Sequence, residues 1–136
     1  MVVDVGKNVY AAFYGLLSGS VVYSGKTIPV YTITAGKSAG DTWVTIEQVE
    51  QASNSSKNSS GYDVSALLAV TTTTDNYVML SDVVNDVLSL LYSAEEIDMG
   101  ELKAYIVGEP RINEVVEYSD SGVFITKYIR LTLYVK

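Results

Sequence analysis

Few residues in this sequence have the types and spacing that could support catalysis. The 136 residues include neither histidine nor cysteine, which excludes sets such as Ser-His-Asp and Cys-His. Glu47 and Glu50 could form the carboxylate pair that glycosidases use. They lie three positions apart in a predicted strand, so their side chains should point to opposite faces of a sheet. We therefore expect no hydrolytic carboxylate pair.

One short segment resembles part of a phosphate-binding loop. Gly36, Lys37 and Ser38 match the end of the pattern G-x-x-x-x-G-K-S, but Tyr31 occupies the position of its first glycine. We predict no nucleotide site there. With no other catalytic set in view, the prediction is a protein that is not an enzyme and has no cofactor.

A group of acidic residues around Gly100 is the remaining candidate for metal binding. Its members are Glu95, Glu96, Asp98 and Glu101. Hard cations such as Ca²⁺ prefer carboxylate oxygens, but this spacing does not match an EF-hand loop. A solvated linker accounts for the same composition, and we favour it over a metal site.

The net charge of −7 limits the possible partners. A surface that grips nucleic acid needs clustered lysine and arginine, so specific nucleic-acid binding is not expected. No stretch approaches the roughly 20 apolar residues that span a bilayer, and the amino terminus lacks the pattern of a secretory signal. These features predict a product of a cytosol with no membrane contact.

Tyrosine is the dominant aromatic residue, with eleven copies against two phenylalanines and one tryptophan. It combines an apolar ring with a polar hydroxyl and is enriched at protein interfaces. Tyr10 and Tyr14 flank the apolar stripe of a predicted helix, and Tyr128 and Tyr134 share one face of the final predicted strand. These four are candidate subunit-interface residues; alternatively, tyrosine only supplies ordinary aromatic packing in strands.

The amino-terminal part of the chain predicts a helix followed by a hairpin. Apolar residues recur at spacings of three and four over 5–18, and Asp4 is a suitable N-cap. The pattern over 21–34 predicts a hairpin with Gly25 at the centre of its turn. Pro29 should lie at a sheet edge or a bulge, because it cannot donate a ladder hydrogen bond.

Two strands joined by a polar loop form the expected centre of the fold. They cover 43–50 and 62–72, and apolar residues at even positions of the second give the period of a half-buried strand. The serine- and asparagine-rich loop 51–61 should lie at the surface. A second helix is predicted over 81–93, with Ser81 as its N-cap.

Three strands over 102–108, 112–118 and 123–135 complete the chain, and the last two form a hairpin. The final strand has one apolar face; the other face carries aromatic and polar side chains and is either exposed or buried against another chain. The whole order predicts an α+β fold, with two helices packed on one face of a mainly antiparallel sheet. No repeat divides the chain, so 1–136 should form a single domain.

The succession of these parts resembles the tail-completion or tail-terminator proteins of tailed bacteriophages. The likeness rests on the pattern V-Y-x-G-K-x-I-P-V-Y at 22–31 and on the segment 51–91, and it covers about two thirds of the chain. The tyrosine- and serine-rich composition is also similar to neck ring proteins of crAss-like gut phages. The chain departs from the family in its strongly serine- and asparagine-rich loop, which offers little contact chemistry.

The resemblance implies a virion structural protein with a tail-terminator-like domain, no activity and no cofactor. Members of the family close into homo-oligomeric rings in the neck between head and tail, and genome DNA passes through the lumen without specific binding. The partners would be other neck, portal and tail proteins, at the head–tail interface of a virion assembled in the host cytoplasm. The alternatives are a head–tail stopper or adaptor of the same neck, and a protein-interaction module unrelated to phages.

A DNA channel built from this protein should have an acidic or neutral lumen, because repulsion of the phosphates prevents a long-lived grip. The densest candidates for the lumen are Glu95, Glu96, Asp98 and Glu101. The alternative is that these residues only keep an outer surface soluble.

Overall fold

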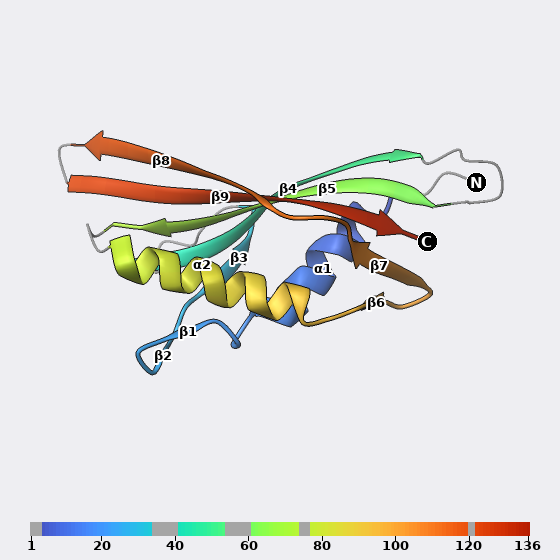
Figure 1. Cartoon of the computed structure of the whole chain (residues 1–136), viewed down its shortest axis with the longest axis horizontal. Coiled ribbons are helices and arrows are strands. Elements are labelled where there is room, and N and C mark those ends of the chain that lie inside the picture. Colours follow the sequence, from blue (N-terminus) through green and yellow to red (C-terminus); the bar gives the residue numbers. More distant parts are fainter. Residues whose placement is uncertain (1–3, 34–40, 54–60, 74–76, 120–121) are drawn as a thin grey trace.

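Two helices on one face of a twisted sheet make up the fold (Figure 1). The computed structural model describes residues 4–33, 41–53, 61–73, 77–119 and 122–136. The predicted α+β class, with a mainly antiparallel sheet, is confirmed. In chain order the elements are α1 (Gly6–Leu17), β1 (Val22–Tyr23), β2 (Lys26–Thr27), β3 (Val30–Thr32), β4 (Thr42–Ser53), β5 (Tyr62–Thr72), α2 (Tyr77–Tyr92), β6 (Ile97–Met99), β7 (Leu102–Ile106), β8 (Arg111–Ser119) and β9 (Gly122–Val135).

The main sheet is organised around β9. It has seven strands in the order β3-β4-β5-β9-β7-β6, and β8 also pairs with β9. One edge of β9 pairs with the whole of β5, whereas the other edge is shared by β8 and then β7. Val107, which lies between β7 and β8 in the chain, donates its N–H to the Thr132 carbonyl of β9 at 2.8 Å. Strands β7 and β8 are therefore one interrupted partner of β9.

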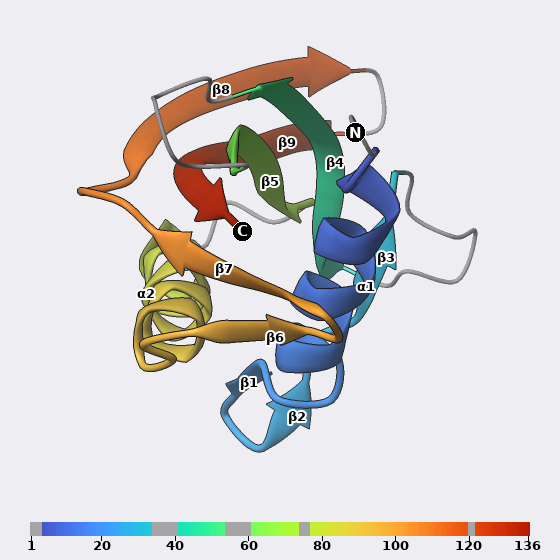
Figure 2. The ribbon, with the colours of Figure 1, turned by 90° about the vertical axis from the view of Figure 1, so that its right-hand side faces the viewer.

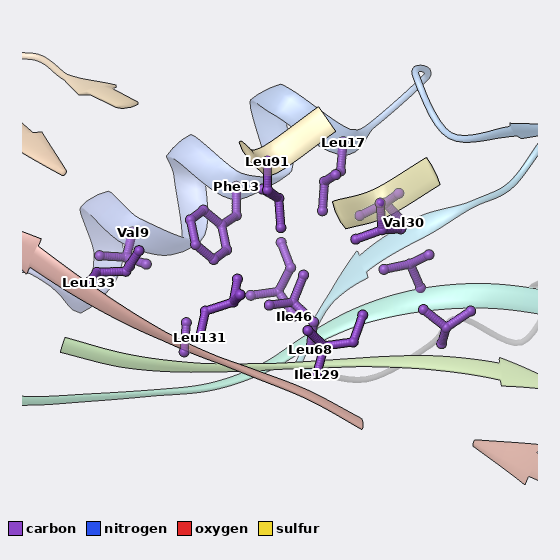
Figure 3. Packing of buried hydrophobic residues seen from close by; sticks show 14 of the residues in the cluster. Val9, Phe13, Leu17, Val30, Ile46, Leu68, Leu91, Ile129, Leu131 and Leu133 are labelled. Carbon is purple, nitrogen blue, oxygen red and sulfur yellow. The ribbon is translucent and has the colours of Figure 1, made fainter. Parts of the chain in front are cut away.

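The hydrophobic core lies between the sheet and the helices (Figure 3). All even positions of β5 are buried, as their period of two predicts. They pack with apolar residues of both helices, among them Val9, Phe13 and Leu17 of α1, which are at most 1% exposed. Full burial of one such side chain is worth about 1.5–3 kcal/mol, so packing against the sheet holds both helices in place.

Strands β4 and β5 form the predicted central pair, but β4 is longer than expected. It continues through Ser53, which places part of the predicted loop in the sheet; the rest of that loop, 54–60, lies outside the described residues. The register shifts at Glu47, which forms a β-bulge. Because a bulge inserts one extra residue, Val49 joins Ile46 on the core side of the strand.

The predicted hairpin over 21–34 is only partly correct. Strands β1 and β2 pair around Ser24 and Gly25, whose φ angles of 49° and 80° suit a type I′ turn. The chain then leaves this hairpin, and β3 joins the main sheet as an edge strand parallel to β4. The Pro29 carbonyl accepts a hydrogen bond from the Val44 N–H at 2.9 Å. The proline thus lies at a sheet edge, as expected.

Helix α2 begins at Tyr77, so Ser81 lies inside it and is not the predicted N-cap. The Ser81 hydroxyl instead accepts a hydrogen bond from the Lys127 ammonium of β9 at 3.3 Å. That ammonium also lies 4.6 Å from the centre of the Tyr77 ring, which is cation–π distance. Lys127 of β9 therefore contacts the amino-terminal part of α2 through both Ser81 and Tyr77.

Helix α1 begins at Gly6, and Val5 rather than Asp4 occupies its N-cap position. The predicted Asp4 cap is thus one residue too early, although its carboxylate accepts the Gly6 N–H at 2.8 Å. Neither helix of the described residues is long and apolar enough to cross a membrane.

Candidate interaction surface

The acidic group predicted as a linker forms the short hairpin of β6 and β7. The Lys103 ammonium lies 3.3 Å from Asp98 Oδ1 and 3.6 Å from Glu96 Oε1. The Tyr105 hydroxyl donates to Glu96 Oε2 at 3.2 Å, and the Gly100 N–H donates to Asp98 Oδ1 at 2.9 Å. The linker interpretation is wrong, because a strand ladder and ion pairs order this segment.

The four candidate lumen residues therefore fall into two kinds. All four are exposed; Glu96 and Asp98 contact Lys103, whereas Glu95 precedes β6 and Glu101 lies in the turn before β7. Among the described residues, no group of three or more acidic side chains is arranged to hold a metal ion. Their place in a lumen stays a prediction.

Replacing Lys103 by glutamine should raise the pKa of Asp98 towards its ordinary value. The hydrogen bond from Gly100 lowers that pKa most, and the Lys103 ammonium lowers it further. A depressed carboxyl pKa stabilises the folded state above the unfolded pKa, and this contribution is lost as the pH falls through the folded value. NMR titration of the Asp98 carboxyl carbon measures the shift, with Lys26→Gln as the control. An unchanged Asp98 pKa would show that the ion pair is absent in solution.

The two glutamates considered as a carboxylate pair both lie in β4 and take part in hydrogen bonds there. Glu47 lies in the bulge, where burial raises its pKa, and its backbone carbonyl accepts a hydrogen bond from the Tyr10 hydroxyl at 3.1 Å. Glu50 accepts a hydrogen bond from Gln48 Nε2 at 3.0 Å. The phosphate-loop fragment 36–38 lies outside the described residues.

The tyrosines of α1 occupy two different environments. Tyr10 is half-buried and bonds to β4 through its hydroxyl, whereas Tyr14, one turn later, is 44% exposed. Both line a shallow depression of about 430 Å³, which we call the α1–β3 groove. Its lining residues are Lys7, Tyr10, Ala11, Tyr14, Thr32 and Ile33.

Tyr128 and Tyr134 lie on the sheet face opposite the helices, which we call the outer face. Tyr128 is half-buried; its pKa is raised by burial and then by the charges of Glu47 and Glu117. Tyr134 packs over Gly61, where an added Cβ would overlap the tyrosine ring. Tyr134 thus has a packing role within the subunit, and a subunit contact for either tyrosine stays a prediction.

Strand β8 carries a surface that the sequence pattern did not indicate. Its residues 111–118 are all exposed, and apolar side chains occupy both of its faces. Ile112, Val116 and Tyr118, which are 44%, 41% and 82% exposed, share the helix side with the core residues of β9; Val115, 39% exposed, lies on the outer face. One signal for this surface is the adjacent pair Val115-Val116, because neighbouring strand residues must point to opposite faces.

The backbone of β8 is also open on one side. Among the described residues β8 pairs with β9 alone, so its other edge presents N–H and C=O groups that can pair with a further chain. Figure 2 shows this strand along the edge of the sheet, away from both helices.

The two arginines of the chain stand opposite each other where β8 begins. Arg111 is in register with Arg130 of β9, so both side chains point to the outer face. Like charges directly opposite each other destabilise a sheet. Arg130 Nη1 donates to the Ser65 hydroxyl at 3.0 Å. Two guanidinium groups in this position are suited to a carboxylate from a partner.

Comparison with known proteins identifies a shared fold. No protein-family model matches the sequence, and the search of curated proteins likewise gives no match. Among solved structures, a chain described as the virion of a native gene transfer agent (GTA) particle matches with a TM-score of 0.57 and 13% sequence identity. The alignment covers 93% of this chain and 86% of that chain. Nearly the whole chain therefore has the fold of a protein from a gene transfer agent virion.

Proposed function

We propose that this chain is a structural protein of a phage-like virion, in which it forms the ring of a tail-completion or tail-terminator protein in the neck. The observation that carries the proposal is the fold shared, over 93% of its length, with a chain of a gene transfer agent virion. In addition, the order of the elements predicted from the sequence resembles that of tail-completion and tail-terminator proteins. Its partners would be portal, neck and tail proteins at the head–tail interface.

The exposed strand β8 fits a protein that works in an assembly. Within the part of the chain that the structure describes, one edge of this strand is unpaired and several of its apolar side chains are exposed. Such edges promote association with another chain, and clustered exposed apolar residues mark interaction sites. A contact between two different surfaces of the same subunit would generate a closed ring.

The proposed role is that of a scaffold rather than an enzyme. Glu47, Glu96 and Asp98, which were candidates for chemistry, take part in hydrogen bonds or ion pairs that hold the fold. The net charge of −7 suits a ring through which DNA passes, because DNA phosphates would be repelled rather than held.

Electron microscopy of the purified full chain tests this proposal. We expect closed rings of uniform diameter. Sedimentation velocity should show one assembled species, whose fraction increases with protein concentration. Reconstitution with the portal and tail proteins of the same particle should place the ring between them. A monodisperse monomer at high concentration, both alone and with those proteins, would overturn the neck-ring function.

A further inference from the structure

We propose that β8 of one copy docks against the α1–β3 groove of the next copy, in a head-to-tail arrangement. The proposal rests on the proposed ring function and specifies which two surfaces meet. The occupant of the groove is therefore a second copy of this chain. Four features of the described residues support this contact: its position, the strand direction, the apolar groups and the charges.

The two surfaces lie at opposite edges of the sheet. Strand β3 forms one edge, β8 lies beyond β9 towards the other, and β4, β5 and β9 run between them. A contact between opposite edges leaves one unused copy of each surface at the ends of a dimer. Addition therefore continues until a ring closes.

Strand direction agrees with this arrangement. Strand β4 is antiparallel to β5, β5 to β9, and β9 to β8. It follows that β8 runs opposite to β4. Suppose that the strands of neighbouring subunits run in the same directions. Then β8 of one copy is antiparallel to β4 of the next copy, and neither subunit has to be inverted.

Strand β3 ends where the incoming strand would lie. It pairs with residues 44–46 of β4, and just beyond its end the Ile33 N–H donates to the Ile46 carbonyl at 2.8 Å. Within the described residues, 48–50 pair with β5 alone. Ile33 has a φ of 71° and is 63% exposed, a left-handed conformation that is rare for a β-branched residue. This conformation keeps an apolar side chain at the rim of the groove.

The apolar groups of the two surfaces match in kind. The helix side of β8 offers Ile112 and Val116, each more than 40% exposed. The groove offers the rings of Tyr10 and Tyr14 and the side chain of Ile33. Aliphatic side chains from a strand that enter a groove lined by aromatic rings are typical of the core of a protein interface.

The charges of the two surfaces are complementary. Lys7 lines the groove, and Glu114 lies between the two apolar residues on the helix side of β8. On the outer face, Arg111 and Arg130 would approach Glu50, which lies on the outer side of β4. The contact thus gives the two opposed arginines a carboxylate, and complementary charges of this kind fix the register of an interface.

Cysteine crosslinking tests the contact directly, because the natural chain contains no cysteine. The variants are Ile33→Cys, Ile112→Cys and the double variant of both, treated with a short bis-maleimide after assembly. We expect a ladder of covalent oligomers from the double variant, dimers from an equal mixture of the two single variants, and monomers from each single variant alone. The control is Val22→Cys combined with Ile112→Cys, which should stay monomeric.

The outcomes separate this contact from the ring function itself. Rings seen by electron microscopy without a 33–112 crosslink would overturn the contact and leave the neck-ring function standing. Dimers of Ile112→Cys alone would show that β8 meets β8, which also overturns it. If the natural chain forms no rings and the 33–112 double variant gives no crosslinked oligomers, the ring function is overturned.

Charge reversal provides a second measurement if a cysteine variant fails to fold. Lys7→Glu and Glu114→Lys should each lower the assembled fraction severalfold, and the combined variant should restore most of it. Equal losses in the single and combined variants would contradict the proposed pairing. Lys26→Glu, at a lysine on β2 outside both surfaces, is the control.

Discussion

Lysine in place of Ile112 and Val116 should abolish ring assembly and leave the fold of the subunit intact. Both side chains are more than 40% exposed in the isolated subunit, so the fold loses little when they are replaced. In the proposed ring both are buried, and each lysine would bring a charge into an apolar contact. Lysine also discourages strand addition at the edges of natural sheets.

The assembled fraction at a fixed concentration should fall by at least about tenfold, because hot-spot residues near an interface centre each cost about 2 kcal/mol or more when truncated. Sedimentation velocity measures this fraction, and thermal unfolding followed by circular dichroism reports on the fold. Val22→Lys is the matched control, because Val22 is a 46% exposed valine on β1, away from β8. Full assembly of the double variant would exclude β8 from the subunit contact.

Replacing Gly61 by alanine should destabilise the subunit by about 1–3 kcal/mol, the usual cost of forcing an extra group into a packed site. A Cβ at this position would overlap the ring of Tyr134. The ring must then leave its place on the outer face of β9, where it is half-buried. Denaturant unfolding of the monomeric protein measures the change in the free energy of unfolding.

A double-mutant cycle shows whether the overlap with Tyr134 is the cause. In a Tyr134→Ala background, Gly61→Ala should cost far less, which gives a coupling energy of about 0.5–3 kcal/mol for residues in contact. Gly15→Ala in α1 is the control, and it should stabilise the subunit instead of destabilising it. An added Cβ meets nothing within 4 Å there, and alanine favours the helix over glycine by about 1 kcal/mol. Additive costs at 61 and 134 would contradict this explanation.

The sequence by itself determined the core side of this fold. The even positions of β5 and the apolar stripes of the two helices predicted which residues are buried, because burial repeats with the period of a strand or a helix. The lack of histidine and cysteine also excludes Ser-His-Asp and Cys-His sets, whichever fold the chain adopts. Local turn chemistry was equally informative, since Gly25 marked the turn between β1 and β2.

Only the tertiary structure decided what each surface residue meets. Tyr10 bonds to a carbonyl of β4 while Tyr14 remains exposed, although both flank the same helical stripe. Tyr77, at the start of α2, lies beside Lys127, which is distant in the chain and comes from β9.

The exposure of β8 was not predicted from the sequence, although the adjacent pair Val115-Val116 is a signal for it. Its own residues predict a strand, but its exposure depends on which neighbours the other strands choose. The opposition of Arg111 and Arg130 likewise follows from the register of β8 on β9. Periodicity reports which side of an element is buried, whereas long-range strand pairing sets the register and the order of strands. The register and the order of the strands therefore decide which groups remain exposed for contact with a partner.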